Sequence, residues 1–250
     1  MRYFLEVAYN GTRYGGSQIQ KNANSIQGEL ERALTIITRT TIKLTGSSRT
    51  DAGVHACQNF YHFNSEAILP VKASYNVNAL LPFDIVVKSI FLVPETAHCR
   101  FLALSREYQY FITSVKNPFK TDTAWYYPYP IDVDLLNKAA DTLYASTDYS
   151  AFSKRNSDVV THHCTVSKSN WIAKNDGLVY TVKANRFLRG MVRGLVGTML
   201  LVGRKRISVS NFEDIIRMKD PAKANFATPA HGLFLVKIEY PISFEALLQK

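Results

Sequence analysis

The pattern of apolar and polar positions predicts alternating strands and helices in the first hundred residues. Tyr3 to Tyr9 alternates with a period of two, as in a strand with one buried face, and Asn10-Gly11 ends it. Ser25 to Thr38 instead carries its apolar residues on one helical stripe, and Asn24 with Gln27 resembles a capping box. Further strands are predicted at 42–45, 59–64 and 85–93.

The second half repeats this order of elements. The pattern predicts a strand at 108–113, a helix from Asp132 to about Tyr144, a hairpin around Asn175-Asp176-Gly177 that joins 171–173 to 178–182, a long helix at 187–201, a helix opened by Ser210-x-x-Glu213, and a closing strand at 233–240. No Pro-, Gly- or Ser-rich linker separates the halves. We therefore expect an α+β fold in which two open sheets join side by side around a shared core.

The predicted helix at 187–201 has an unusual polar side. Helical spacing places Arg186, Arg189 and Arg193 on one face, where three like charges repel unless an acid or a phosphate lies there. Gly190, Gly194 and Gly197 run beside them. Such glycines either allow tight packing on a sheet, which is the simpler interpretation, or let another backbone lie against the helix.

Composition changes this picture mainly through charge. The 250 residues carry a net charge of +10 with a pI near 9.5, which favours a polyanionic partner. Three scattered cysteines indicate free thiols in a reducing compartment, and neither a signal peptide nor a membrane-spanning apolar run is present, so we expect a cytoplasmic protein. His162-His163-Cys164 cannot aim three neighbouring strand residues at one ion, so no metal is expected there. His55 and His62 are assigned structural roles.

One small, polar loop combines an acid with glycines and an arginine. Taken alone, Asp51 would be a helix cap or turn residue, which is the usual role of an aspartate in a turn. Arg49 precedes it by two positions and would keep the carboxyl ionised, as a nucleophile or base requires. Gly46 and Gly53 allow close approach to a ligand. The combination favours a catalytic role for Asp51.

The string Gly46-Ser-Ser-Arg-Thr-Asp-Ala-Gly-Val-His-Ala56 resembles the signature of the tRNA pseudouridine synthase A family. Other segments match in the same order along nearly the whole chain: residues 9–18, 25–34, 78–85, 98–101, 106–110, 184–193 and 231–235. The family usually has Trp where this chain has Ser17, which puts a packing or RNA contact in doubt. Residues 154–169 match poorly, so no role is transferred to them.

The resemblance implies a pseudouridine synthase fold of two ferredoxin-like (RRM-like) subdomains, residues 1–104 and 105–250, with mainly antiparallel sheets around a basic cleft. It implies that Asp51 is the catalytic nucleophile, that Arg49 helps to extrude the target base, that Tyr108 contacts this base, and that Arg193 pairs with Asp51. Arg186, Arg189 and Arg106 are further candidate RNA contacts. The expected activity is isomerisation of uridines 38, 39 and 40 of the tRNA anticodon stem-loop by a homodimer without cofactor or metal.

The residues themselves leave alternatives open. Tyr108 and Tyr110 share one strand face and would ordinarily fill a core, although a tyrosine facing a cleft can stack on a flipped uracil. A non-catalytic RNA-binding protein with RRM-like sheets is the main rival, and the absence of an RNP1 pattern counts against it. A hydrolase with Asp51 as nucleophile would leave the +10 charge unexplained. Whether Asp51 attacks the nucleoside or abstracts a sugar proton stays open.

Overall fold

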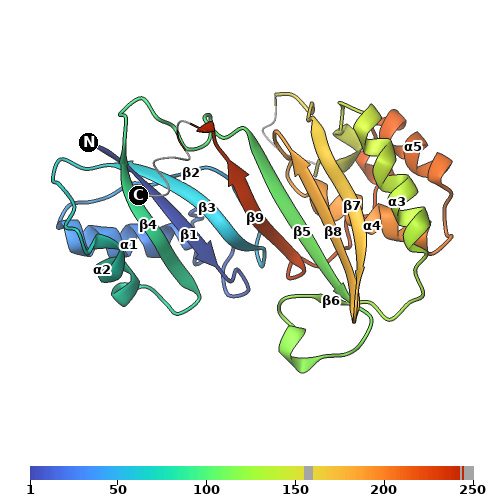
Figure 1. Cartoon of the computed structure of the whole chain (residues 1–250), viewed down its shortest axis with the longest axis horizontal. Helices are drawn as coiled ribbons and strands as arrows, with labels where there is room; N and C mark the ends of the chain where they lie inside the picture. Colours follow the sequence, from blue (N-terminus) through green and yellow to red (C-terminus); the bar gives the residue numbers. More distant parts are fainter. Residues whose placement is uncertain (155–159, 243, 245–250) are drawn as a thin grey trace. The chain divides into compact units, whose positions relative to one another are not determined.

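In a computed structural model of the chain, residues 1–154, 160–242 and 244 can be described. They form two compact α+β units: Met1–Leu104 together with the chain from Leu235 onward, and Ser105–Phe234 (Figure 1). This division differs from the expected one in its last segment, because the chain from Leu235 onward belongs to the first unit and not to the second. None of the described helices is long and apolar enough to cross a bilayer.

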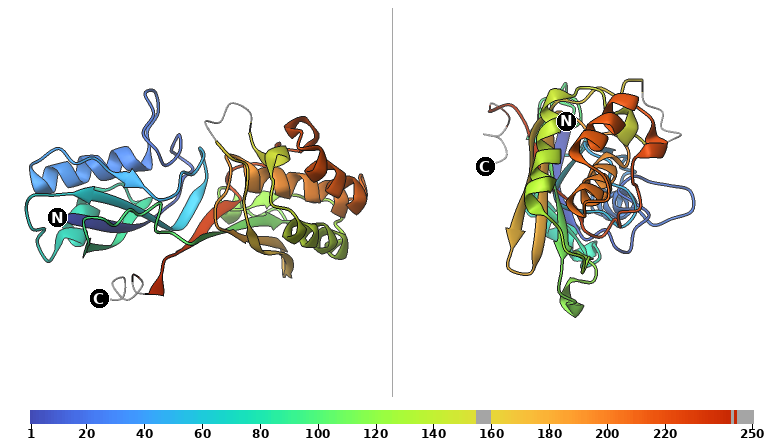
Figure 2. Two further views of the ribbon diagram at one scale, coloured as in Figure 1. Left: turned by 90° about the horizontal axis from the view of Figure 1, so that it is seen from above. Right: turned by 90° about the vertical axis from the view of Figure 1, so that its right-hand side faces the viewer.

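The first unit has the strand and helix order of a ferredoxin-like fold. Its elements are β1 (Arg2–Tyr9), α1 (Ile26–Thr38), β2 (Thr45–Gly46), β3 (His55–Asn64), α2 (Ala73–Leu80) and β4 (Ile85–Val93), joined by β9 (Leu233–Glu239) from Leu235 onward. The sheet order is β4-β1-β3-β9, with the short β2 also beside β3. β1 runs antiparallel to both neighbours, so its buried side chains form the centre of the core. Helix α1 lies along one face of this sheet and contacts α2 (Figure 2).

Helix α1 begins one residue later than its sequence signal indicated. The N-cap is Ser25, whose hydroxyl accepts from the Gly28 amide at 3.1 Å, so the predicted Asn24–Gln27 capping box is wrong. Gln27 instead turns its amide toward Leu44 and Glu31, donating to the Leu44 carbonyl at 2.9 Å. Asn and Ser are equally good caps, so composition alone could not choose between adjacent positions.

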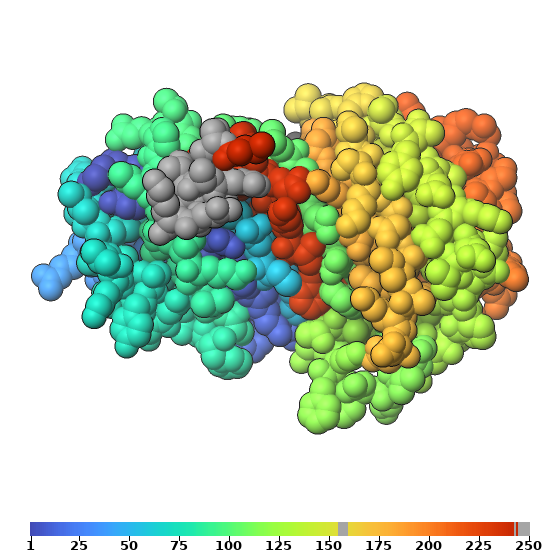
Figure 3. All heavy atoms as spheres, in the orientation of Figure 1, coloured from blue at the N-terminus to red at the C-terminus, as the bar shows by residue number. Residues whose placement is uncertain are grey.

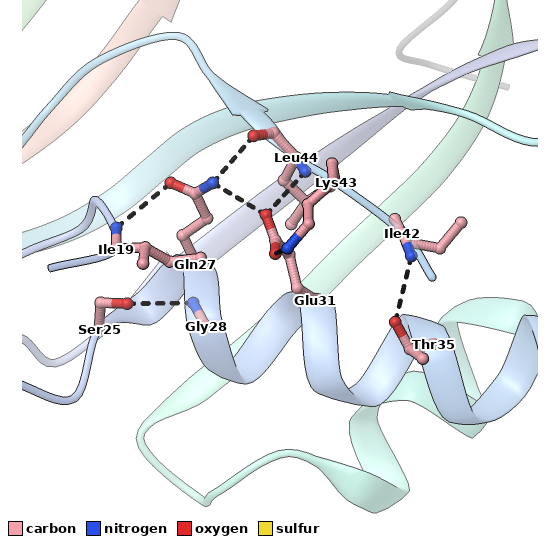
Figure 4. A network of polar contacts seen from close by, with 9 residues as sticks. All are labelled: Ile19, Ser25, Gln27, Gly28, Glu31, Thr35, Ile42, Lys43 and Leu44. Carbon is pink, nitrogen blue, oxygen red and sulfur yellow. Dashed lines mark hydrogen bonds and ion pairs between the residues drawn. The ribbon is translucent and has the colours of Figure 1, made fainter. Parts of the chain in front are cut away.

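A buried carboxylate ties α1 to the segment that leads into β2. Glu31 accepts from the Leu44 amide at 2.9 Å and from the Gln27 side chain at 2.9 Å, and Lys43 pairs with its other oxygen at 3.3 Å (Figure 4). Thr35 accepts from the Ile42 amide at 3.2 Å in the same view. The predicted strand at 42–45 is therefore an extended segment held by side chains of α1, and only Thr45–Gly46 pairs with β3.

The second unit also places helices after and between antiparallel strands. Its elements are β5 (Ser105–Thr113), β6 (Trp125–Tyr126), α3 (Val133–Asp141), β7 (Val166–Lys174), β8 (Gly177–Ala184), α4 (Met191–Gly203) and α5 (Val209–Met218), with short 3-10 turns at Pro118–Lys120, Thr142–Ala145, Ser150–Phe152 and Pro221–Lys223. The strand order is β5-β8-β7 and all these pairings are antiparallel, while β6 runs parallel to β5. Residues of β7 are exposed at the surface (Figure 3). Helices α3, α4 and α5 contact one another.

Several boundaries predicted for the second half are confirmed and two are wrong. Asp132 caps α3, with its side chain accepting from the Leu135 amide at 3.1 Å, and the hairpin around Asn175-Asp176-Gly177 joins β7 to β8. The capping box of α5 is formed by Ser208 and Asn211, two residues before the predicted Ser210. Helix α4 begins at Met191 after Gly190, which has a φ of 74°, so the helix expected from Phe187 starts one turn later.

The glycines of α4 let the chain's own backbone lie against the helix. A Cβ at Gly197 would lie 2.3 Å from the Asn225 carbonyl oxygen, and one at Gly194 would lie 2.8 Å from the Phe226 ring. The contact is fixed by a hydrogen bond of 2.9 Å from the Asn225 amide to the Thr198 hydroxyl. Of the two interpretations of this stripe, close approach of another backbone is therefore right for Gly197, and sheet packing is not its cause.

We expect Gly197→Ala to lower the free energy of unfolding by about 1–3 kcal/mol, because the new methyl group must displace the Asn225 carbonyl. The loss should appear although alanine favours helix by about 1 kcal/mol over glycine. Gly28→Ala in α1 is the matched control, since its Cβ would meet side-chain atoms, the Ser25 hydroxyl at 3.1 Å and Ile19 at 4.0 Å, and not backbone. Urea denaturation of both variants measures the difference, and equal midpoints would contradict this packing argument.

Candidate active site

The candidate acid lies on the connection between β2 and β3 of the first unit. The Val54 amide donates to the Asp51 carbonyl at 3.1 Å, which closes a four-residue turn. Gly53 occupies the third position of this turn with a φ of 76°, a conformation that favours glycine. Asp51 caps none of the described helices and is half-buried, while Arg49 on the same loop is exposed. The helix-cap interpretation of Asp51 is therefore excluded.

The segment between β1 and α1 contacts the loop through Gly16 and Ser17. Gly16 forms an isolated antiparallel bridge with Asp51. Both backbone polar groups of Thr50 are bonded to Ser17: the Ser17 amide donates to the Thr50 carbonyl at 3.1 Å, and the Thr50 amide donates to the Ser17 hydroxyl at 2.8 Å. Gly16 has a φ of 123°, and a Cβ there would lie 2.8 Å from the Thr50 carbonyl oxygen. The residue next to Asp51 is thus fixed from two directions.

Uncharged polar side chains from β1 and β3 support the loop inside the core. The hydroxyls of Tyr9 and Thr50 are 2.9 Å apart, and the Asn59 amide donates to Tyr9 at 3.2 Å and to the Ser48 carbonyl at 2.9 Å. The Tyr9, Thr50 and Asn59 side chains are buried. Burial raises the pKa of Tyr9, so its phenol stays neutral. The support of the loop consists of satisfied, neutral hydrogen bonds, an arrangement that stabilises one conformation.

Gly11 and His55 fix the C-terminal end of the loop, where β3 begins. The Gly11 amide donates to Nδ1 of the buried His55 at 3.1 Å, so this nitrogen carries no proton. A Cβ at Gly11 would lie 2.0 Å from the Val54 carbonyl oxygen. His55 therefore has a structural contact in this unit, as expected from the sequence.

In the second unit, the candidate base-contacting tyrosine lies beside the segment that precedes α4. The Tyr108 and Phe187 rings meet edge to face with centroids 5.0 Å apart. Arg106, on the same strand and nearly buried, donates to the Asn185 carbonyl at 2.9 Å. Tyr108 and Tyr110 are both buried, and the Tyr110 hydroxyl donates to the Pro229 carbonyl at 2.9 Å. The prediction that Tyr110 fills the core is confirmed.

Only one of the three predicted helix arginines lies on α4. Arg193 is half-buried in the first turn and its Nε donates to the Thr228 carbonyl at 2.6 Å. Arg186 and the exposed Arg189 precede the helix, so the shared helical face expected for them is wrong. Burial raises the pKa of Tyr110, and the positive charge of Arg193 opposes this shift. Arg193 and Tyr110 thus bond to the carbonyls of two consecutive residues, Thr228 and Pro229, in the second unit.

The predicted site residues thus form two groups, each described within its own unit. Asp51 and Arg49 share one loop of the first unit, and Arg106, Tyr108 and Arg193 belong to the second. The pairing of Asp51 with Arg193 stays a prediction. Sequence reasoning missed the supporting residues of the loop: Tyr9, Gly11, Gly16, Thr50 and Asn59. Thr50 lies within the loop signature, and Tyr9, Gly11 and Gly16 lie within the matching segment 9–18, but neither match indicated what these residues contact.

We expect Ser17→Ala to weaken the support of the loop. The substitution leaves the buried Thr50 amide without its hydroxyl acceptor, which costs about 1–3 kcal/mol. Urea denaturation should show this loss, and the turnover number should fall about tenfold as the loop becomes less ordered, while substrate affinity changes little. Ser114→Ala is the control, because this exposed hydroxyl makes a single long contact of 3.4 Å among the described residues. Wild-type stability and turnover in Ser17→Ala would show that the hydroxyl has no supporting role.

Comparison with known proteins agrees with the loop signature. A family model described as tRNA pseudouridine synthase matches residues 139–241. The tRNA pseudouridine synthase A of Parabacteroides distasonis is 41% identical over 96% of both chains. The enzyme of that name from Bacteroides thetaiotaomicron is 42% identical over 96% of this chain and 91% of its own, and one from Staphylococcus aureus is 33% identical over 95% and 90%.

Proposed function

Because the chain belongs to the tRNA pseudouridine synthase A family, we propose that it isomerises uridine to pseudouridine in tRNA with Asp51 as the catalytic carboxylate. The observation that carries this proposal is the construction of the loop around Asp51. The loop is held by neutral hydrogen bonds from Ser17, Tyr9 and Asn59, while Asp51 itself remains half-exposed. A fixed and accessible carboxylate is what a reaction at a positioned nucleoside requires.

The reaction exchanges one bond of the ribose for another. The bond between N1 of the uracil and C1′ of the ribose breaks, the base rotates, and a bond from C5 to C1′ forms, while C5 releases its hydrogen as a proton and N1 gains a proton. No group is oxidised or donated, so the reaction is internally balanced and we propose that no cofactor takes part. Asp51 acts either by adding covalently to the nucleoside or by abstracting a sugar proton. In both cases it must be ionised.

The other candidate residues have positioning roles in this proposal. Removing a base from the helical stack costs a few kcal/mol, which stacking and phosphate contacts offset. Tyr108 contacts the extruded uracil, Arg49 helps to extrude it, and Arg193 pairs with Asp51. Arg106, Arg186 and Arg189 contribute weaker RNA contacts. The net charge of +10 supports a polyanionic substrate.

We further propose that the substrates are uridines 38, 39 and 40 of the anticodon stem-loop and that the enzyme acts in the cytoplasm as a homodimer. The test uses unmodified tRNA transcripts labelled with tritium at C5 of uridine. Each transcript has uridine at one of the three positions and cytidine at the other two, and a further transcript has cytidine at all three. Tritium release that requires uridine at one of the three positions is the expected result. Release that persists without any of them would overturn the site assignment, and tRNA binding without release would favour the non-catalytic RNA-binding alternative.

A further inference from the structure

The first unit holds a cluster of histidine and cysteine side chains away from the Asp51 loop. His62 lies on β3, and His98 and Cys99 lie in the segment that follows β4. One potential ligand atom from each residue lies within 4.8 Å of the other two. His62 and Cys99 are buried and His98 is partly exposed, so the cluster extends from the core to the surface.

The contacts inside the cluster converge on the sulfur atom. Cys99 Sγ is 3.1 Å from His62 Nδ1 and 3.1 Å from the Thr45 carbonyl oxygen. The two imidazole rings meet edge to face with centroids 4.6 Å apart. The sulfur atom is therefore the centre of the cluster, with one imidazole nitrogen and one carbonyl oxygen beside it.

We propose that His62, His98 and Cys99 bind one zinc ion or a similar borderline-soft divalent cation. Thiolate and imidazole are the ligands that zinc prefers in proteins. Bond lengths of about 2.3 Å to sulfur and 2.1 Å to nitrogen in a tetrahedral site place the two ligand atoms roughly 3.6 Å apart. Small side-chain movements from the present separations reach this geometry. The Cys99 thiol releases its proton to solvent when the metal binds.

Two features of the surroundings limit the affinity. The Arg2 guanidinium, which donates to the Ala97 carbonyl at 2.8 Å, is close enough to lower the pKa of both histidines and therefore also repels a cation. His98 Nδ1 accepts from the Arg100 amide at 3.2 Å, so this nitrogen binds metal only after that bond is broken. The negative charge of the thiolate offsets the repulsion between Arg2 and the cation. A fourth ligand position remains for water or the Thr45 carbonyl.

The cluster is connected by its backbone to the start of the Asp51 loop. The Cys99 carbonyl accepts from the Ser47 hydroxyl at 2.8 Å and from the Tyr240 hydroxyl at 2.6 Å. Both donors belong to the first unit, and Ser47 directly follows β2. A bound metal would therefore stabilise the contacts of the Cys99 backbone with Ser47 and Tyr240. The role that we assign to this metal is structural.

The test uses the full chain without an affinity tag, treated with a chelator and then titrated with Co²⁺. We expect one equivalent to produce a thiolate-to-cobalt absorption band that Zn²⁺ removes, and Zn²⁺ to raise the melting temperature. Cys99→Ser should abolish the band. His98→Ala should weaken Zn²⁺ binding at least about 100-fold, since altering even the groups that orient metal ligands costs 10–100-fold.

The other two cysteines are matched controls. Cys57→Ser removes an exposed thiol and Cys164→Ser removes a buried one that follows His163 in the sequence, and both should leave the band unchanged. Absence of the band in the unchanged protein, or its persistence in Cys99→Ser, would overturn the proposal and leave a hydrogen-bonded core cluster. If Cys99→Ser does not fold, His98→Ala decides, because Zn²⁺ affinity equal to that of the unchanged protein would exclude His98 as a ligand.

Discussion

Replacing Asp51 with asparagine should stop pseudouridine formation while tRNA binding stays close to that of the unchanged protein. The amide has nearly the same shape but is neither a nucleophile nor a base, so we expect the rate to fall on the order of 10⁴-fold or more. The loop should keep its conformation, since it is held through Ser17, Tyr9 and Asn59. Single-turnover release of tritium from labelled tRNA measures the rate, and fluorescence anisotropy measures the dissociation constant.

A second carboxylate of the same unit provides the control for this experiment. Glu95 is exposed and pairs only with the amino terminus among the described contacts, at 3.1 Å. Glu95→Gln makes the same chemical change and should release tritium at the wild-type rate. A tritium-release rate for Asp51→Asn within a few-fold of that of Glu95→Gln would refute the assignment of Asp51. Loss of tRNA binding in Asp51→Asn would instead indicate that the carboxylate orders the loop.

Replacing Gly11 with alanine should reduce turnover at least about 100-fold without any change in a proposed catalytic residue. The new methyl group would lie 2.0 Å from the Val54 carbonyl oxygen. Neither group can turn away by rotating a side chain, so the backbone of the loop has to move. The same movement breaks the hydrogen bond from the Gly11 amide to His55. Displacements of about 1 Å in a catalytic group cost on the order of 100-fold in rate. The turnover number should fall more than the affinity for tRNA.

The Gly28→Ala variant again supplies the comparison, because it adds the same methyl group to the same unit without meeting backbone. Its turnover should equal that of the unchanged protein. Circular dichroism at the assay temperature establishes that Gly11→Ala is folded. Full activity in folded Gly11→Ala would mean that the loop tolerates displacement, and the argument that a rigid loop presents Asp51 would then be wrong.

Local patterns predicted the elements well where the signal lies within the element. The alternation at Tyr3–Tyr9 and the apolar run at Ile85–Val93 correspond to β1 and β4, and the Asn-Asp-Gly turn joins β7 to β8. Cap positions were shifted at α1 and α5, because several Ser and Asn residues stand together and all are good caps. The start of α4 was missed because the apolar stripe continues backward past Gly190, whose backbone is left-handed.

The candidate site shows the corresponding limit. The Asp51 loop could be identified from eleven contiguous residues, because its signature is local. The residues that support the loop could not be identified in this way, because Tyr9, Ser17 and Asn59 come from three separate segments and meet the loop only in the folded unit. The same holds for His62, which the sequence left without a partner and which lies 3.1 Å from the Cys99 sulfur. Periodicity reports which face is buried, not which distant polar group lies there.

The bond from Arg193 Nε to the Thr228 carbonyl has a thermodynamic consequence for the pairing with Asp51 that we propose. An arginine side chain normally loses much rotamer freedom when it is immobilised on a ligand. Here that entropy has already been lost during folding, when residues 225–228 packed against α4. A lysine at this position would carry the same charge but has a single donor atom, so it could not bond this carbonyl through one nitrogen and an acid through the others. The proposed pairing with Asp51 should therefore cost less side-chain entropy with arginine at position 193 than with lysine.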